Sequence, residues 1–93
     1  MSNNYKNNFK IRVHKTFFET NYHHICEIFP FFKNNINNLD KYLEIEPETF
    51  AKLLNYSKTG TIELHLTTIS KLIIASELLG AKELSEQLKE LIL

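Results

Sequence analysis

Two histidines and the only cysteine of the chain lie close together, at His23, His24 and Cys26. On a helix, His23 and Cys26 would share one face, three residues apart, which is a spacing found among metal ligands. A structural zinc site needs four ligands, usually as two pairs, and no second pair exists because His14 and His65 stand alone. We therefore predict no metal site within one chain, and interpret these residues as surface histidines beside a partly buried thiol. A zinc site completed between two subunits is the alternative.

Catalytic chemistry has little support in the same residues. A cysteine nucleophile needs an activated thiolate and a base within hydrogen-bond reach, whereas Cys26 stands in the apolar stretch 25–29, where burial disfavours the thiolate. Three glutamates alternate at Glu44, Glu46 and Glu48 without a partner that would mark an acid–base pair. The two glycines are isolated, so no phosphate-binding loop is present. The sequence predicts neither an enzyme nor a site for a cofactor or small-molecule substrate.

Composition narrows the class of protein. The chain has 93 residues, of which 43% are hydrophobic, and this size and content are typical of one globular domain. Eleven basic residues balance eleven acidic ones, which argues against a general nucleic-acid binder. No apolar run approaches a membrane span, and the single cysteine fits a reducing compartment, so we predict a cytoplasmic protein. Residues encoded by AT-rich codons (Asn, Lys, Ile, Phe and Tyr) make up 41 of the 93, which indicates an AT-rich genome such as that of a virus or protist.

The elements that position these residues are expected to begin after a flexible leader, residues 1–8, which has no apolar period. Phe9–Val13 alternates apolar and polar residues and predicts a strand, and Thr16–Thr20 predicts a second. His14 and Lys15 between them predict a hairpin turn. Neither residue favours the positive φ of a two-residue primed turn, which favours a longer or bulged connection.

The rest of the chain is predicted to be mostly helical. A short helix is expected at 22–29, stopped by Pro30, with a surface loop at 33–38 and a third strand at 42–45. Pro47 and Gly60 suit the first turn and the left-handed end of a second helix. An extended link at 62–66 leads to a helix that Thr67 or Thr68 caps, which ends at Leu79 and is apolar almost all round. An amphipathic helix is expected over 81–93. This order is an α+β layout.

Three runs carry a resemblance to a known family. The run IRVHKTFFET from Ile11 resembles the opening of potassium-channel tetramerisation domains, a branch of the BTB/POZ superfamily, with Ile11, Val13, Phe18 and Thr20 at the pattern positions. The run EPETFAKLLNYSKTG resembles the second signature of the family. Its matching residues are Glu46, Pro47, Phe50, Leu53, Leu54, Asn55, Lys58 and Gly60. The run LIIASELLGAKEL resembles the following helix and turn, around Ala75, Gly80 and Leu84.

The resemblance covers residues 9–90 and implies one BTB/POZ domain over 9–93, with a small three-stranded sheet and about five helices. It implies a protein–protein interaction module that forms a homo-oligomer, a tetramer or pentamer ring. In such rings the sheet side of one subunit meets the helical side of the next. Carried onto this chain, the candidate interface residues are Arg12, Glu19, Asp40, Glu44 and Lys52. The alternative function is that of an adaptor docking on a cullin-type ubiquitin ligase scaffold.

The sequence also departs from the family pattern. His14 and Lys15 replace the usual Gly-Gly of the first hairpin, which leaves the geometry of that hairpin open. The zinc motif of some channel domains, one histidine followed by three cysteines, is absent because Cys26 is the only cysteine.

Overall fold

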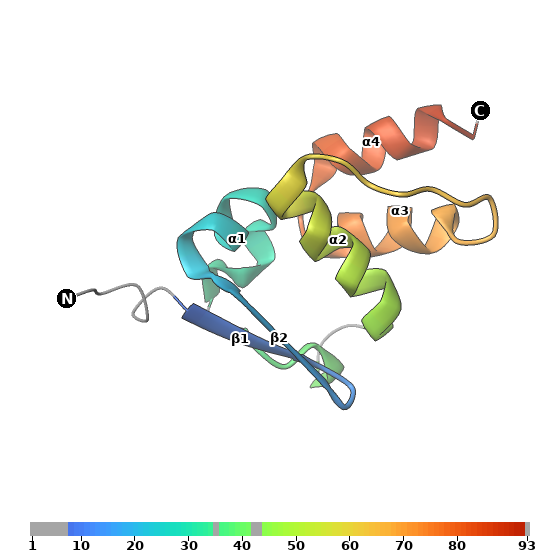
Figure 1. Cartoon of the computed structure of the whole chain (residues 1–93). Helices are drawn as coiled ribbons and strands as arrows, with labels where there is room; N and C mark the ends of the chain where they lie inside the picture. The colour runs from blue at the N-terminus through green and yellow to red at the C-terminus, as the bar shows by residue number, and fades with distance from the viewer. Residues whose placement is uncertain (1–7, 35, 42–43, 93) are drawn as a thin grey trace.

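The computed structural model describes residues 8–34, 36–41 and 44–92. A β-hairpin carries a cluster of helices on one face, so the molecule has one thin sheet layer and one thick helical layer (Figure 1). The hairpin consists of β1 (Asn8–Val13) and β2 (Thr16–Asn21). The helices are α1 (Tyr22–Ile28), α2 (Pro47–Thr59), α3 (Ile69–Leu78) and α4 (Lys82–Glu90), with short 3₁₀ turns at Pro30–Asn34 and Leu39–Lys41.

The hairpin confirms both predicted strands and has a two-residue turn, without a bulge or a longer connection. β1 and β2 pair antiparallel, with Lys10 opposite Glu19 and Arg12 opposite Phe17. His14 adopts a positive φ of 57°, the conformation for which glycine is normally selected, while Lys15 keeps a negative φ. The turn is therefore built by the residue types that the sequence argued against.

The predicted third strand at 42–45 is wrong in its described part. Tyr42 and Leu43 lie outside the described residues, and Glu44 and Ile45 are not in a strand. Ile45 is buried in the core, Glu46 is the N-cap residue of α2, and Pro47 begins that helix, so this stretch leads into a helix rather than pairing in a sheet. In the described residues, β1 also forms one parallel bridge, in which Arg12 pairs with Asn38 of the segment before the Leu39–Lys41 turn. In the described residues the sheet has two strands instead of three.

The helix ends follow local chemistry. Asn21 caps α1 because its side-chain oxygen accepts a hydrogen bond from the amide of His24 at 2.9 Å. Pro47 occupies the first turn of α2, and Gly60 ends that helix with a φ of 78°, as predicted. Pro30 stops α1 as predicted and begins a 3₁₀ turn over Pro30–Asn34, which includes the first two residues of the loop predicted at 33–38. The last helix ends at Glu90 rather than at the end of the chain.

One buried cluster joins the two layers, extending along the chain from Ile11 to Leu88. At its centre Phe29, Phe32 and Phe50 are fully buried, and the rings of Phe32 and Phe50 meet edge to face with centroids 6.1 Å apart. Helix α3 is less enclosed than its apolar composition predicts. Its residues Leu72 and Ile73 are buried, but Ile74 is 56% exposed and Leu78 is 43% exposed.

Candidate protein-interaction surface

The outer face of the hairpin is a mixed charged and aromatic surface. Strand alternation buries Ile11, Val13 and Thr20 against the helices and leaves the other set of side chains in solvent. The exposed set consists of Lys10, Arg12, Phe17 and Glu19, and we call it the hairpin face. Phe17 is 61% exposed, and the Lys10 ammonium lies 5.7 Å from the centroid of its ring.

Asp40 holds the end of this face. One carboxylate oxygen of Asp40 accepts a hydrogen bond from the backbone amide of His14 at 2.8 Å, and the other lies 4.0 Å from Nε of Arg12. The same Nε donates to the carbonyl oxygen of His14 at 2.8 Å. The Arg12 and Asp40 side chains are both partly exposed, so the Coulomb attraction between them is small. The hydrogen bonds matter more, because they fix the turn at its strained residue.

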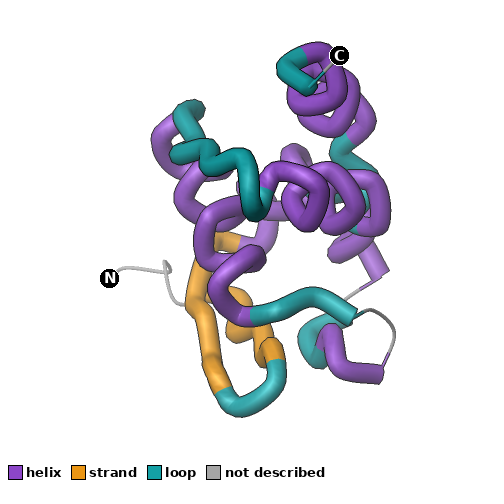
Figure 2. The backbone as a smooth tube through the Cα atoms, turned by 90° about the vertical axis from the view of Figure 1, so that its right-hand side faces the viewer, coloured by secondary structure: helices purple, strands orange, loops and turns teal. Residues whose placement is uncertain are grey.

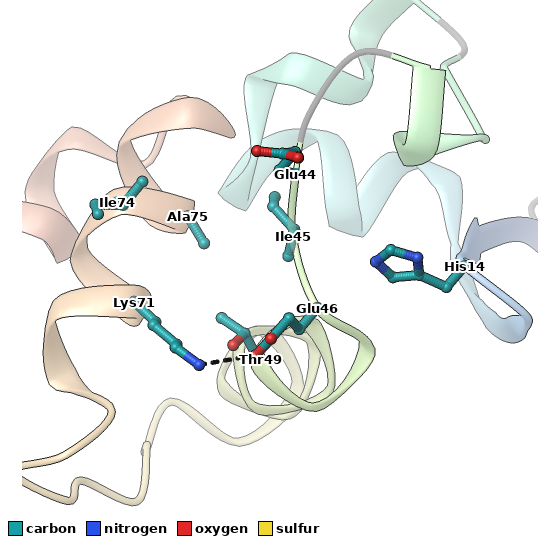
Figure 3. Close-up of a pocket in the computed structure, with 8 residues that line it drawn as sticks. All are labelled: His14, Glu44, Ile45, Glu46, Thr49, Lys71, Ile74 and Ala75. Carbon is teal, nitrogen blue, oxygen red and sulfur yellow. Dashed lines mark hydrogen bonds and ion pairs between the residues drawn. The ribbon is translucent and has the colours of Figure 1, made fainter.

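A pocket of about 410 Å³ lies beside the hairpin turn, between the start of α2 and the exposed side of α3 (Figure 3). His14 borders one side and Lys71 another, and Ile45 and Ala75 form its apolar floor. Figure 3 shows Lys71 reaching toward Glu46, with which it forms an ion pair at 3.1 Å. Among the described residues that line it, no group is arranged as a nucleophile with a base.

The structure places the five predicted interface residues on two surfaces. Arg12 and Glu19 lie on the hairpin face, and Asp40 lies at its end. Glu44 lines the 410 Å³ pocket. Lys52 lines a smaller hollow on α2 that shares Glu46 and Lys71 with that pocket, so Glu44 and Lys52 belong to the helical side of the molecule.

Several exposed apolar residues were not among the predicted site residues, and those on the hairpin and on α3 lie on regular elements. Phe17 lies on the hairpin face, and the alternation of TFFET could have revealed it, because adjacent aromatic residues in a strand must point to opposite faces. Ile74 and Leu78 are four residues apart and form an exposed stripe on α3. The sequence did not indicate which side of that helix would be exposed, since the helix is apolar almost all round.

The histidine and cysteine cluster is built into the junction of α1 and α2. His24 Nε2 makes a hydrogen bond with the backbone oxygen of Ser57, which links the two helices. Cys26 is buried. The pKa of Tyr22 is raised, mainly by a hydrogen bond with the Cys26 side chain and to a smaller extent by desolvation of the phenol. Within residues 8–34, 36–41 and 44–92 no three potential ligands gather in a way that could hold a metal ion.

The remaining family-pattern residues occupy structural positions. Seven of them pack in or against the core: Val13, Phe18, Thr20, Phe50, Leu53, Leu54 and Ala75. Pro47 starts α2, and Gly60 and Gly80 follow α2 and α3 with positive φ. Asn55 is exposed on α2, where its carbonyl oxygen accepts a hydrogen bond from Thr59.

Membrane insertion by a helix has no support in the described part of the chain, where no helix is both long and apolar enough to span a bilayer.

Comparison with known proteins identifies the fold. No protein-family model matches the sequence, and no curated protein matches it either. Among solved structures, the chain is similar to the BTB domain of zebrafish PATZ1, with a TM-score of 0.77 over 90% of this chain and 73% of that one. The sequence identity is 20%, so the likeness is one of fold, and the narrower resemblance to tetramerisation domains stays a prediction. The chain has a BTB/POZ fold.

Proposed function

We propose that this chain is a protein–protein interaction module that assembles with copies of itself. The observation that carries the proposal is a BTB/POZ fold whose hairpin face exposes Phe17 between charged residues. BTB domains are in general non-catalytic modules for protein interaction and oligomerisation. The zero formal net charge supports self-association, because copies experience little long-range repulsion.

The specific assembly that we propose is a tetramer or pentamer ring, as the resemblance to tetramerisation domains implies. A ring needs two different surfaces on each subunit that fit one another. The candidate residues divide in this way, with Arg12, Glu19 and Asp40 at the hairpin and Glu44 and Lys52 on the helical side. The free thiol of Cys26 fits a cytoplasmic location for such an assembly.

Mass in solution tests the proposal. Light scattering at tens of micromolar is expected to give four or five times the 11.0 kDa of one chain. Glu19→Lys is expected to lower the assembled fraction by opposing charge on the hairpin face, and Lys52→Glu in the same chain is expected to restore it if the two residues face each other across the contact. Glu27→Lys on α1 makes the same charge change on an exposed residue away from the hairpin face and serves as the control. A monomeric mass for the unmodified chain would refute self-assembly.

The alternative that we retain is an adaptor that docks on a cullin-type scaffold. The exposed stripe of Ile74 and Leu78 favours a second partner, because it belongs to α3 and not to the hairpin. Retention of a cullin in a pull-down, lost in Ile74→Ser but kept in Glu19→Lys, would support this function. Failure of any cullin to bind at low salt would count against it.

A further inference from the structure

The outer edge of β2 is an open strand edge. The Arg12 amide donates to the carbonyl oxygen of Asn37 at 2.7 Å, so the backbone groups of Arg12 point away from β2. Arg12 and its partner Phe17 are thus a non-hydrogen-bonded pair, and alternation of the antiparallel ladder makes Lys10 and Glu19 another. The amides and carbonyls of Phe17 and Glu19 therefore point away from β1. In the described part of the chain, they make no backbone hydrogen bond to another segment.

This edge has few of the features that usually protect an edge strand. Charged side chains, above all lysine, together with proline and bulges commonly discourage pairing with another chain. β2 reads TFFETN, so its only charge is Glu19, and its register with β1 is regular over all six residues. In Figure 2 the hairpin lies at the lower left of the molecule. The bridge between Arg12 and Asn38 lies on the β1 side of the sheet. The β2 side of the sheet is the side on which another strand can be added.

We propose that β2 pairs antiparallel with β2 of a second copy, so that two hairpins form one four-stranded sheet. The inference rests on the proposed self-association and adds a second contact, separate from the ring contact, that joins chains in pairs. The two-fold axis passes beside Phe18, which places Phe17 of one copy opposite Glu19 of the other. Both residues have outward backbone groups, so each of the two symmetric pairs exchanges two hydrogen bonds.

The side chains on the outer face complement one another in this register. Each row across the sheet reads Lys10, Glu19, then Phe17 and Arg12 of the second copy. Glu19 keeps Lys10 on one side and gains an aromatic neighbour on the other, and no two like charges stand directly opposite. A shift of the register toward the end of β2 would oppose Glu19 to Glu19 of the other copy, and a shift toward the turn would oppose Glu19 to Lys15, which lies outside the strand. Self-complementarity of this kind favours a second copy over an unrelated strand. Because both copies use the same edge, the contact joins two copies and leaves no β2 edge open for a third.

Hydrogen exchange of individual amides tests the pairing on the unmodified chain. The Phe18 amide lies in the β1–β2 ladder and is expected to be protected at every concentration. The Phe17 and Glu19 amides are expected to be protected only at concentrations where light scattering reports dimers or dimer-based assemblies. Unprotected Phe17 and Glu19 amides in an assembled sample would overturn the edge pairing and leave self-assembly intact. A monomer at all concentrations would overturn both.

A pair of variants isolates the backbone contribution. Glu19→Pro removes an amide that faces away from β1, which an edge strand tolerates, and it deletes two symmetric hydrogen bonds from the dimer. We expect the dissociation constant to rise by about 10- to 30-fold. Glu19→Ala removes the same carboxylate but keeps the amide, so it reports only what the Glu19 side chain contributes to the contact, and we expect the dissociation constant to rise by clearly less than in Glu19→Pro. Equal effects of the two variants in folded protein, judged by circular dichroism, would contradict the backbone pairing.

Discussion

Replacing His14 by glycine should stabilise the protein. His14 has a φ of 57° at the hairpin turn, and a side chain in that region is crowded by its own backbone. Glycine adopts the same conformation without this crowding, which is why primed hairpin turns select it. The backbone hydrogen bonds that hold the turn, from the His14 amide to Asp40 and from Arg12 to the His14 carbonyl, do not depend on the imidazole.

The expected gain follows from two opposing contributions. A left-handed conformation costs about 1–2 kcal/mol for a residue with a Cβ atom. Glycine lowers the free energy of unfolding by about 0.4–1 kcal/mol because it makes the unfolded chain more flexible. The imidazole is mostly exposed and lies 3.9 Å from Asp40, so its removal costs little. The net gain is about 0.5–1 kcal/mol, which for a domain of this size raises Tm by about 3–6 °C.

Thermal and urea unfolding of three variants measure this gain. Lys15→Gly is the matched control, since Lys15 has a negative φ and glycine there should lower stability by about 0.4–1 kcal/mol. His14→Ala keeps the Cβ and removes the ring, so it reports what the imidazole contributes. The reasoning fails if His14→Gly is no more stable than the unmodified chain, or if Lys15→Gly gains as much.

Three further substitutions probe the connections between elements: Gly80→Ala, Gly60→Ala as its comparison, and Asp40→Ala. Gly80→Ala should destabilise by about 2 kcal/mol or more, because its Cβ would approach Cδ of Pro30 to 3.2 Å at a φ of 90°, whereas Gly60→Ala meets open space and should cost about 1 kcal/mol. Chemical denaturation decides the order, and an equal loss in both variants would show that backbone strain alone acts. Asp40→Ala should cost about 1 kcal/mol by freeing the His14 amide, and faster exchange of that amide would identify the bond as the cause; an unchanged exchange rate would contradict it.

The regular elements were predictable because their side chains carry a clear period. Phe9–Val13 alternates, and the structure pairs it with Thr16–Asn21 in the expected hairpin. The strand predicted at 42–45 was wrong for a physical reason. Leu43 and Ile45 have the alternation of strand residues, but Ile45 is buried in the core just before α2 begins at Pro47. Pairing partners depend on the tertiary fold, and no local pattern marked Asn38 as the residue that bridges to Arg12.

The candidate interaction surface was predictable in its charges but not in its geometry. Arg12 and Asp40 were each proposed separately, and the structure brings them together around the backbone of His14. That contact joins a strand end to a segment 26 residues away, and a single sequence contains no signal for it. The open edge at Phe17 and Glu19 was not predictable, because the register between β1 and β2 determines which amides of β2 bond to β1 and which point outward.

The carboxylate of Asp40 on the His14 amide also bears on how relatives of this chain are detected. A turn of two glycines needs no outside support, whereas a turn without glycine gains from a hydrogen bond supplied across the sheet. In sequences with this hairpin, we therefore expect either glycines at the turn or an acidic residue at the position of Asp40, so that a substitution at one place is accompanied by a substitution at the other. A search pattern that requires the glycines would overlook chains of this kind. One that accepts either glycines at the turn or an acidic residue at the distant position would include them.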